Sequence, residues 1–260
     1  MTFVDTHAHL YSSQYEEDRC EMVARSLEAG VTRIMLPDVD SLSRAALEQL
    51  AAKYDFCFPM VGLHPTSVND NPQWRGELEI VAQLLAWDHT RYCAVGEMGI
   101  DLYWSREFEA EQREAFRMQI ELALKYDLPV AIHSRDAWDA LFEELTPFKD
   151  RGVRGVIHAF SGDVSHYQRL LSLGDFLFGI GGVVTFKKSP LAIAVAQMDL
   201  SHIVLETDAP YLTPTPHRGK RNESSYIPHI AAKIAELHAV DISHVAAVTT
   251  ANAERMFLIG

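Results

Sequence analysis

The sequence predicts a single (β/α)8 barrel, or TIM barrel, an α/β fold built on a parallel sheet. Short apolar, β-branched segments alternate with longer amphipathic segments along the whole chain. Eight such pairs fit within 260 residues, the usual size of this fold, and no linker divides them. The first strand-to-helix turn carries no GxGxxG or GxxxxGK motif, which argues against a nucleotide-binding open sheet. We therefore expect one barrel domain over residues 1–260.

The elements follow one another in regular order. Apolar, β-branched runs predict strands at 2–5, 31–36, 56–62, 92–96, 129–132, 153–158, 176–180 and 202–205. Amphipathic runs predict helices at 16–29, 41–53, 75–87, 107–126, 136–147, 163–173, 189–198, 226–238 and 242–257. Gly30 lies where a helix commonly ends, Asp163 can cap the helix that follows it, and Ser189-Pro190 is a typical helix start.

Composition excludes several classes of protein. The formal net charge of −13 disfavours a broad basic surface for duplex DNA. Nucleic acid stays open as a substrate if metal ions and a few local basic residues hold the phosphates. The three cysteines form no CxxC pair, so neither a disulfide framework nor a thiolate zinc site is indicated. With no apolar leader and no run long enough to span a membrane, we expect a cytoplasmic protein that does not cross a membrane. No obligate protein partner is evident from the sequence.

Histidine and acidic side chains, which can ligate metal ions, recur at the ends of the predicted strands. Barrel enzymes have their active sites at these strand ends. His7 and His9 are two residues apart on an extended chain, so both side chains face the same side. Most of the later candidates are about one or two βα units apart, which predicts positions around one rim. They are His64 after the third strand, Glu97 and Asp101 after the fourth, His133 after the fifth, His158 after the sixth, and Glu206 and Asp208 after the eighth.

This set predicts a metal centre, although a single histidine at a strand end is usually structural. Imidazole and carboxylate ligands suit Zn, Mn or Mg. Four histidines are too many for one catalytic ion that keeps open positions, whereas two ions with a bridging carboxylate use them naturally. Glu97 is the natural bridge, and Asp208 would bind one ion and accept a proton from the attacking water. Asp101 and Glu206 can be read as loop or capping residues, an interpretation favoured for Glu206.

The chain resembles the TatD-related metal-dependent deoxyribonucleases, which are amidohydrolase-like TIM barrels. The resemblance spans nearly the whole length and rests on eight segments in family order: DTHAHL, GLHP, VGEMGIDLY, LPVAIHSRDA, GVIHAFSGD, GIGGVVTFKKS, LETDAPYLTP and RGKRNESSYIPHI. It implies a divalent-metal hydrolase that removes nucleotides from DNA ends, commonly from 3′ to 5′. It also implies that His7, His9, Glu97 and Asp208 hold one ion, and that Glu97, His133 and His158 hold the second.

Four further residues are predicted on the substrate side. The basic stretch HRGKRNE at 217–223 follows the eighth strand, and Arg218 or Arg221 could grip a phosphate. His64 is assigned to the substrate because the ligand count is already filled. Tyr211 could stack on a base or simply pack, and packing is slightly favoured. The expected substrate is DNA with single-stranded or frayed ends, and RNA stays open.

Two other functions stay open. A binuclear hydrolase of a small ester, amide or phosphoester would use the same metal ions, but a neutral amide would not need the basic loop. A non-catalytic binding protein on a barrel scaffold is disfavoured because every proposed ligand is present.

Overall fold

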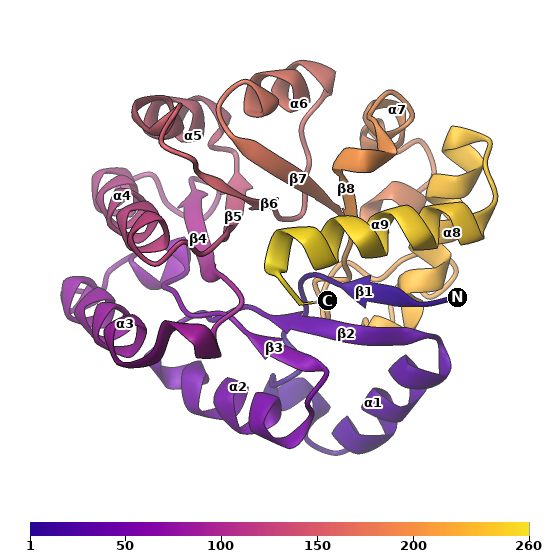
Figure 1. The fold of residues 1–260 in the computed structure, drawn as a ribbon, viewed down its shortest axis with the longest axis horizontal. Helices are drawn as coiled ribbons and strands as arrows, with labels where there is room; N and C mark the ends of the chain where they lie inside the picture. Colours follow the sequence, from indigo (N-terminus) through magenta and orange to yellow (C-terminus); the bar gives the residue numbers. More distant parts are fainter. Residues whose placement is uncertain (260) are drawn as a thin grey trace.

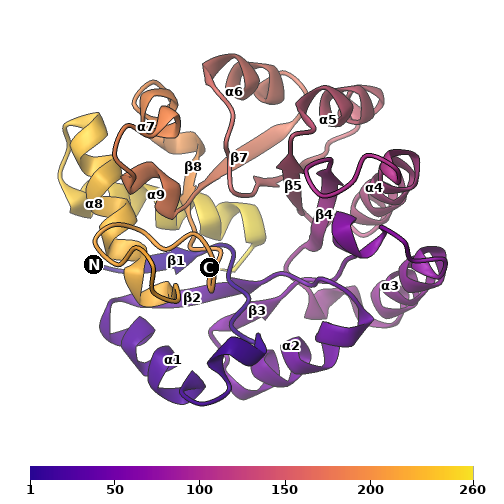
Figure 2. The same cartoon turned by 180° about the vertical axis from the view of Figure 1, so that it is seen from behind.

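The computed structural model describes residues 1–259, in which eight parallel strands form a barrel surrounded by helices (Figures 1 and 2). The strands are β1 (Phe3–Asp5), β2 (Val31–Leu36), β3 (Cys57–Pro59), β4 (Val95–Asp101), β5 (Val130–Arg135), β6 (Arg154–Ile157), β7 (Asp175–Ile180) and β8 (Ile203–Leu205). The helices are α1 (Arg19–Glu28), α2 (Ser41–Lys53), α3 (Trp74–Asp88), α4 (Glu109–Lys125), α5 (Trp138–Leu145), α6 (Val164–Leu171), α7 (Pro190–Val195), α8 (Ile227–His238) and α9 (Ile242–Phe257). The predicted fold class is confirmed.

Two short seams join the strand ladders β1–β2–β3 and β4 to β8 into a ring. At the β3–β4 seam, Val61 pairs with Val95, and the amide of Val61 donates to the carbonyl of Ala94 at 3.2 Å. At the β1–β8 seam, the amide of Thr6 donates to the carbonyl of Leu205 at 2.9 Å. Both seams lie close to the predicted metal ligands, so barrel closure fixes the distances across the site.

The apolar core has two parts. One lies between the strands and the surrounding helices and contains Phe116, Phe142 and Phe178. The other lies inside the barrel, where residues such as Val4 and Leu177 pack against the end of α9. In Figure 1, α9 crosses one end of the barrel, which leaves the opposite end for function. Within residues 1–259, no helix combines the length and the apolar character that a membrane crossing requires.

The fourth strand differs from the expected 92–96: β4 runs from Val95 to Asp101 and continues past Glu97. Its pairing with β5 is irregular between Val95 and Met98. There the chain bonds instead to Asp38, whose amide donates to the carbonyl of Gly96 and whose carbonyl accepts from the amide of Glu97. The predicted third strand, 56–62, is likewise reduced to β3 and the single pair at Val61. These irregularities are backbone features that an apolar pattern does not report.

The predicted helix ends are mostly confirmed. Gly30 has a left-handed φ of 85° just after α1, and the Asp163 side chain caps α6. Pro190 lies in the first turn of α7 as expected, and Ser189 is the capping position. The Ser189 hydroxyl nevertheless makes no capping hydrogen bond, so this helix begins without that contribution.

We predict that Gly99→Ala destabilises the protein, because β4 lies unusually close to β5 at this residue. A Cβ atom on Gly99 would lie 1.9 Å from the carbonyl oxygen of His133. Such overpacking typically costs about 1–3 kcal/mol of unfolding free energy. Gly76→Ala in α3 is the control, since its Cβ would meet only Gln73 Oε1 at 3.9 Å. Thermal denaturation should show a lower midpoint for Gly99→Ala alone; equal midpoints would contradict this account of the strand packing.

Candidate metal centre

Five strands bring the predicted metal ligands to one point at the carboxyl end of the barrel. His7 and His9 follow β1, Glu97 lies within β4, His133 lies within β5, His158 follows β6, and Asp208 follows β8. Their ligand atoms form three overlapping groups in which all atoms lie within 4.8 Å of one another: His7, Glu97 and His158; His7, His9 and Asp208; and His64, Glu97 and His133. The structure therefore gathers all six residues, with His64 beside them.

Glu97 lies at the centre of the cluster and is 2% exposed. Its Oε2 lies 3.0 Å from Nε2 of His7, and its Oε1 lies 3.0 Å from Nδ1 of His133. Burial opposes ionisation of this carboxyl, but the surrounding histidines hold its pKa well below the usual range. An ionised carboxylate with both oxygens directed at different histidines has the arrangement that a bridging ligand requires.

Asp208 approaches the cluster from the opposite side of the barrel. Its Oδ1 lies 3.6 Å from Nε2 of His9 and 3.7 Å from Nε2 of His158. Burial again opposes ionisation, but the nearby histidines His9, His158 and His7 lower the pKa of Asp208. Its side chain is 15% exposed, whereas that of Glu97 is 3% exposed, so Asp208 is the carboxylate that solvent can reach.

The donor set fits divalent cations. Nitrogen and oxygen ligands lie about 2.0–2.2 Å from such an ion, so two ligands of one ion are separated by up to about 4.2 Å. His9 Nε2 lies 3.6 Å from Glu97 Oε2, and His158 Nε2 lies 3.8 Å from Glu97 Oε1. These separations exceed normal hydrogen bonds but match atoms that share an ion. Burial and the neighbouring His158 lower the pKa of His7 to about 4, so His7 is neutral, as a ligand must be.

Glu206 orients His158, which corrects its interpretation as an ordinary loop residue. Its Oε2 accepts a hydrogen bond from Nδ1 of His158 at 3.1 Å, and its Oε1 accepts from the amide of Ala159 at 2.8 Å. The side chain is fully buried. Burial disfavours the charged imidazole of His158, but Glu206, Glu97 and Asp208 raise its pKa to about 10, so a metal ion would bind Nε2 in place of a proton. The hydrogen bond at Nδ1 leaves Nε2 of His158 facing the candidate metal centre.

His9 and His133 are oriented in the same way. Nδ1 of His9 donates to the hydroxyl of Tyr11 at 2.8 Å, because that hydroxyl in turn donates to the carbonyl of Pro37. Nε2 of His133 donates to Oδ2 of Asp101 at 2.9 Å, which leaves Nδ1 facing Glu97. Asp101 is therefore also an orienting residue and not a loop residue without a role. Such partners fix the tautomer and direction of a ligand histidine.

His64 is placed beside the ligands, but its hydrogen bonds give it a different role. Its Nδ1 accepts from the amide of Thr66 at 3.1 Å. An accepting Nδ1 carries no hydrogen, so the ring proton resides on Nε2, and burial favours this neutral form by lowering the pKa of His64. That Nε2 lies 3.3 Å from Oε1 of Glu97. A protonated nitrogen cannot ligate a metal ion, so His64 is arranged as a hydrogen-bond donor.

Asp5 is the carboxylate of the first motif for which no role was predicted. It is fully buried, and burial raises its pKa to about 7. Its Oδ1 accepts from the amide of Thr207 at 3.0 Å, and its Oδ2 accepts from the Thr207 hydroxyl at 2.6 Å. It also accepts from the amide of His7 at 3.3 Å. Asp5 thus ties the ends of β1 and β8 together beneath the ligands.

A cavity of about 1250 Å³ opens above the candidate metal centre. It reaches from His9, His64 and Asp208 to Trp104, Arg135 and Tyr211 at its mouth. Tyr211 is 54% exposed, so the structure places this ring where a substrate can contact it. The volume exceeds the roughly 300–1,000 Å³ of a typical small-molecule pocket.

The two arginines of the basic loop differ. Arg221 pairs with Asp18 at 2.7 Å, and its guanidinium lies 4.4 Å from the ring centroid of Tyr15. Arg218 is exposed, and its guanidinium lies 3.6 Å from the ring centroid of Phe186. Within residues 1–259, no carboxylate pairs with Arg218. Of the two, Arg218 has the charge that is free for a phosphate.

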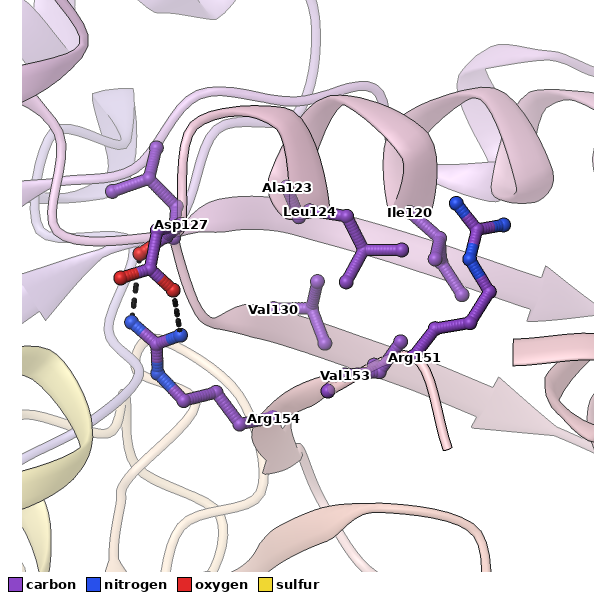
Figure 3. Close-up of a pocket in the computed structure, with 10 residues that line it drawn as sticks. Ile120, Ala123, Leu124, Asp127, Val130, Arg151, Val153 and Arg154 are labelled. Carbon is purple, nitrogen blue, oxygen red and sulfur yellow. Dashed lines mark hydrogen bonds and ion pairs between the residues drawn. The ribbon is translucent and has the colours of Figure 1, made fainter. Parts of the chain in front are cut away.

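A second, smaller cavity of about 170 Å³ lies at the amino-terminal ends of β5 and β6 (Figure 3). Two arginines border it, but both are already neutralised. Arg154 bonds to the carboxylate of Asp127, as Figure 3 shows, and Arg151 bonds to Glu121. This cavity lacks the free charge and the ligand cluster of the other end.

The whole chain has known relatives. A family model described as "TatD related DNase" matches residues 4–258. The "Uncharacterized metal-dependent hydrolase YabD" of Bacillus subtilis is 36% identical over 257 residues, covering 98% of each chain. The "3'-5' ssDNA/RNA exonuclease TatD" of Citrobacter rodentium is 33% identical over 260 residues, covering 97% of each chain.

Solved structures show the same similarity. The TatD homologue YjjV from Escherichia coli is 29% identical, with a TM-score of 0.92 over 99% of this chain and 98% of that one. A TatD family hydrolase from Entamoeba histolytica is 22% identical, with a TM-score of 0.86 over 98% of each chain. At the lower identity, the likeness concerns the fold alone.

We predict that Glu206→Gln weakens metal binding by about 10–100-fold, as is typical when the partner of a ligand histidine is lost. The glutamine offers one oxygen to two buried donors, His158 and the Ala159 amide, so one donor is left unpaired. Chelator competition with Zn²⁺ or Mn²⁺ measures the affinity. Glu254→Gln, a change in a surface pair with Arg33, is the control and should leave the affinity unchanged. Equal affinities in both variants would remove Glu206 from the metal centre.

Proposed function

Because this chain belongs to the TatD-related deoxyribonuclease family, we propose that it is a divalent-metal-dependent 3′-to-5′ exonuclease acting on single-stranded DNA ends, with RNA as a second substrate. The family assignment rests on the model match over residues 4–258 and on relatives above 30% identity along nearly the whole chain. One observation carries the proposal: a buried carboxylate, Glu97, is surrounded by histidines in a relative of named exonucleases.

We assign two ions to the cluster. His7, His9, Glu97 and Asp208 would hold the first ion, and Glu97, His133 and His158 would hold the second. The short separations from Glu97 to His7 and to His133 support Glu97 as the shared ligand. When bound, two divalent cations would stabilise the attacking and leaving oxygens of a phosphoryl displacement and lower the pKa of the attacking water. Zn, Mn and Mg all suit these donors.

The chain itself supplies the proton transfer and the positioning. Asp208 is ionised and reached by solvent, so it can accept the proton of the attacking water as a general base. His64 can donate its Nε2 hydrogen to a phosphate oxygen of the substrate, in keeping with its tautomer. Both side chains line the same cavity.

The shape and charge of the cavity favour a polymer end over a small molecule. The volume of about 1250 Å³ accommodates more than one nucleotide, whereas a small ester or amide needs less. The net charge of −13 disfavours long contacts with a duplex, so local groups must hold the strand. We propose that Arg218 contacts a phosphate and that Tyr211 contacts a base. Arg221 is retained as a weaker candidate, because releasing it for a phosphate would break its pair with Asp18.

We predict that the metal-loaded protein degrades linear single-stranded DNA and that chelation abolishes this activity. An exonuclease requires an end, so circular single-stranded DNA of the same length should survive. Gel analysis of 3′- and 5′-labelled strands measures the rate and the polarity. Equal loss of circular and linear DNA would contradict exonuclease action. Hydrolysis of small esters or amides with no attack on DNA would instead favour the alternative, a binuclear small-molecule hydrolase.

We predict that Asp208→Asn lowers the single-turnover rate by about 10²–10⁴-fold, the usual contribution of a positioned general base. The amide keeps the size of the side chain and an oxygen for a metal ion, but it cannot accept the proton. DNA affinity and metal content should therefore persist in part. Asp241→Asn serves as the control, because Asp241 caps the first turn of α9 and is not one of the residues gathered around Glu97. Cleavage by Asp208→Asn at nearly the wild-type rate under saturating enzyme would show that another group is the base.

A further inference from the structure

Two aromatic side chains lie exposed at the mouth of the cavity without an assigned role. Tyr103 and Trp104 follow β4 and are 53% and 67% exposed. Their rings meet edge to face, with centroids 5.0 Å apart. Trp104 lines the same cavity as the metal ligands. A large flat ring exposed at a cavity wall is positioned to contact what enters the cavity.

Arg135, at the end of β5, completes this group. Its guanidinium lies 3.7 Å from the ring centroid of Tyr103 and 5.6 Å from that of Trp104. Arg135 also lines the cavity and is exposed. In the part of the chain that the structure describes, no carboxylate forms an ion pair with it. We call Tyr103, Trp104 and Arg135 the aromatic shelf.

The aromatic shelf is fixed to the metal centre by one side chain. Oδ1 of Asp101 accepts from the amide of Tyr103 at 3.1 Å and from the amide of Trp104 at 3.4 Å. Oδ2 of the same carboxylate accepts from His133, a proposed ligand. Asp101 is 1% exposed. A buried carboxylate therefore anchors the backbone of the shelf directly beside a proposed metal ligand.

We propose that the aromatic shelf is a base-stacking subsite, in which Trp104 stacks on the base next to the nucleotide being removed. This inference rests on the proposed nuclease function and deepens it. Every base has a flat face, so an exposed indole can bind any of them with little sequence preference. The unpaired guanidinium of Arg135 adds a positive charge for the adjoining phosphate in an otherwise acidic protein.

An unpaired base is the occupant that fits all three residues together. Stacking needs a base that has left its duplex, which agrees with a single-stranded end. A protein partner would bury a wider apolar area than two rings beside a charge. The β7 and β8 loops, which carry Arg218 and Phe186, lie on the other side of the barrel from β4 and β5 (Figure 2). A strand that enters the cavity past Tyr211, which follows β8, would therefore meet the base platform on the opposite side.

The test combines a variant with an altered oligonucleotide. Binding of a fluorescent phosphorothioate hexathymidylate to the metal-loaded protein is measured by anisotropy, with an abasic site placed at each position in turn. For Trp104→Ala we expect about 5- to 150-fold weaker binding of the intact strand. We also expect the affinity of wild type to fall when the base next to the end is removed. The affinity of Trp104→Ala should not change with that removal. Trp104→Phe should restore most of the affinity, because a ring remains.

Trp87→Ala is the matched control. Trp87 is 73% exposed and also has an arginine, Arg91, over its ring at 5.2 Å, but it lies at the end of α3, away from the cavity. This variant should bind as wild type does. Hydrolysis of bis(p-nitrophenyl) phosphate by wild type and Trp87→Ala measures the metal centre without an oligonucleotide. The metal content of Trp104→Ala should equal that of wild type, which separates lost stacking from a damaged metal centre.

The outcomes separate the two proposals. If wild type binds and cleaves the strand and Trp104→Ala does so equally well, the aromatic shelf is refuted while the nuclease function stands. If both proteins lose the same affinity at each abasic position, Trp104 does not stack on that base and the shelf is likewise refuted. If wild type neither binds nor cleaves any oligonucleotide, yet hydrolyses the small diester, both the nuclease function and the base-stacking role of the aromatic shelf are refuted.

Discussion

The structure at the carboxyl end of the barrel depends on one constraint: a carboxylate, Glu97, is buried among histidines. Its burial is unfavourable unless positive charge compensates it, and the surrounding imidazoles already hold its pKa well below the usual range. Divalent cations would provide that compensation more fully than protons. The backbone accommodates this demand where β4 leaves its regular pairing with β5 and bonds to Asp38.

Around this carboxylate, a second set of side chains determines which nitrogen three of the proposed ligand histidines present. Glu206 holds Nδ1 of His158, Tyr11 holds Nδ1 of His9, and Asp101 holds Nε2 of His133. His64 has the opposite arrangement, because Thr66 donates to its Nδ1 and leaves the proton on Nε2. Chemically identical imidazoles thus suit different proposed roles, metal ligand or hydrogen-bond donor, because their neighbours in the loops differ.

Asp101 and Asp5 connect this centre to the rest of the molecule. Asp101 bonds both to His133 and to the loop that carries Trp104, so the same carboxylate positions a proposed ligand and a proposed base platform. Asp5 bonds across the β1–β8 seam to Thr207, close to His7 and Asp208. The closure of the barrel and the geometry of the site are therefore maintained by the same buried polar groups.

The sequence alone determined the barrel, most of its element boundaries and the set of residues that gather at its carboxyl end. The hydrophobic periodicity of strands and helices can be recognised in short segments of sequence. Because parallel strands end at one rim, the sequence alone predicts that His7, His133 and Asp208 lie close together. Only the tertiary structure decided the roles of Glu206, Asp5 and Asp101, because their partners lie far away in the chain. It also distinguished Arg221, which is paired with Asp18, from Arg218, whose charge is free, since ion pairing depends on which loops meet in space.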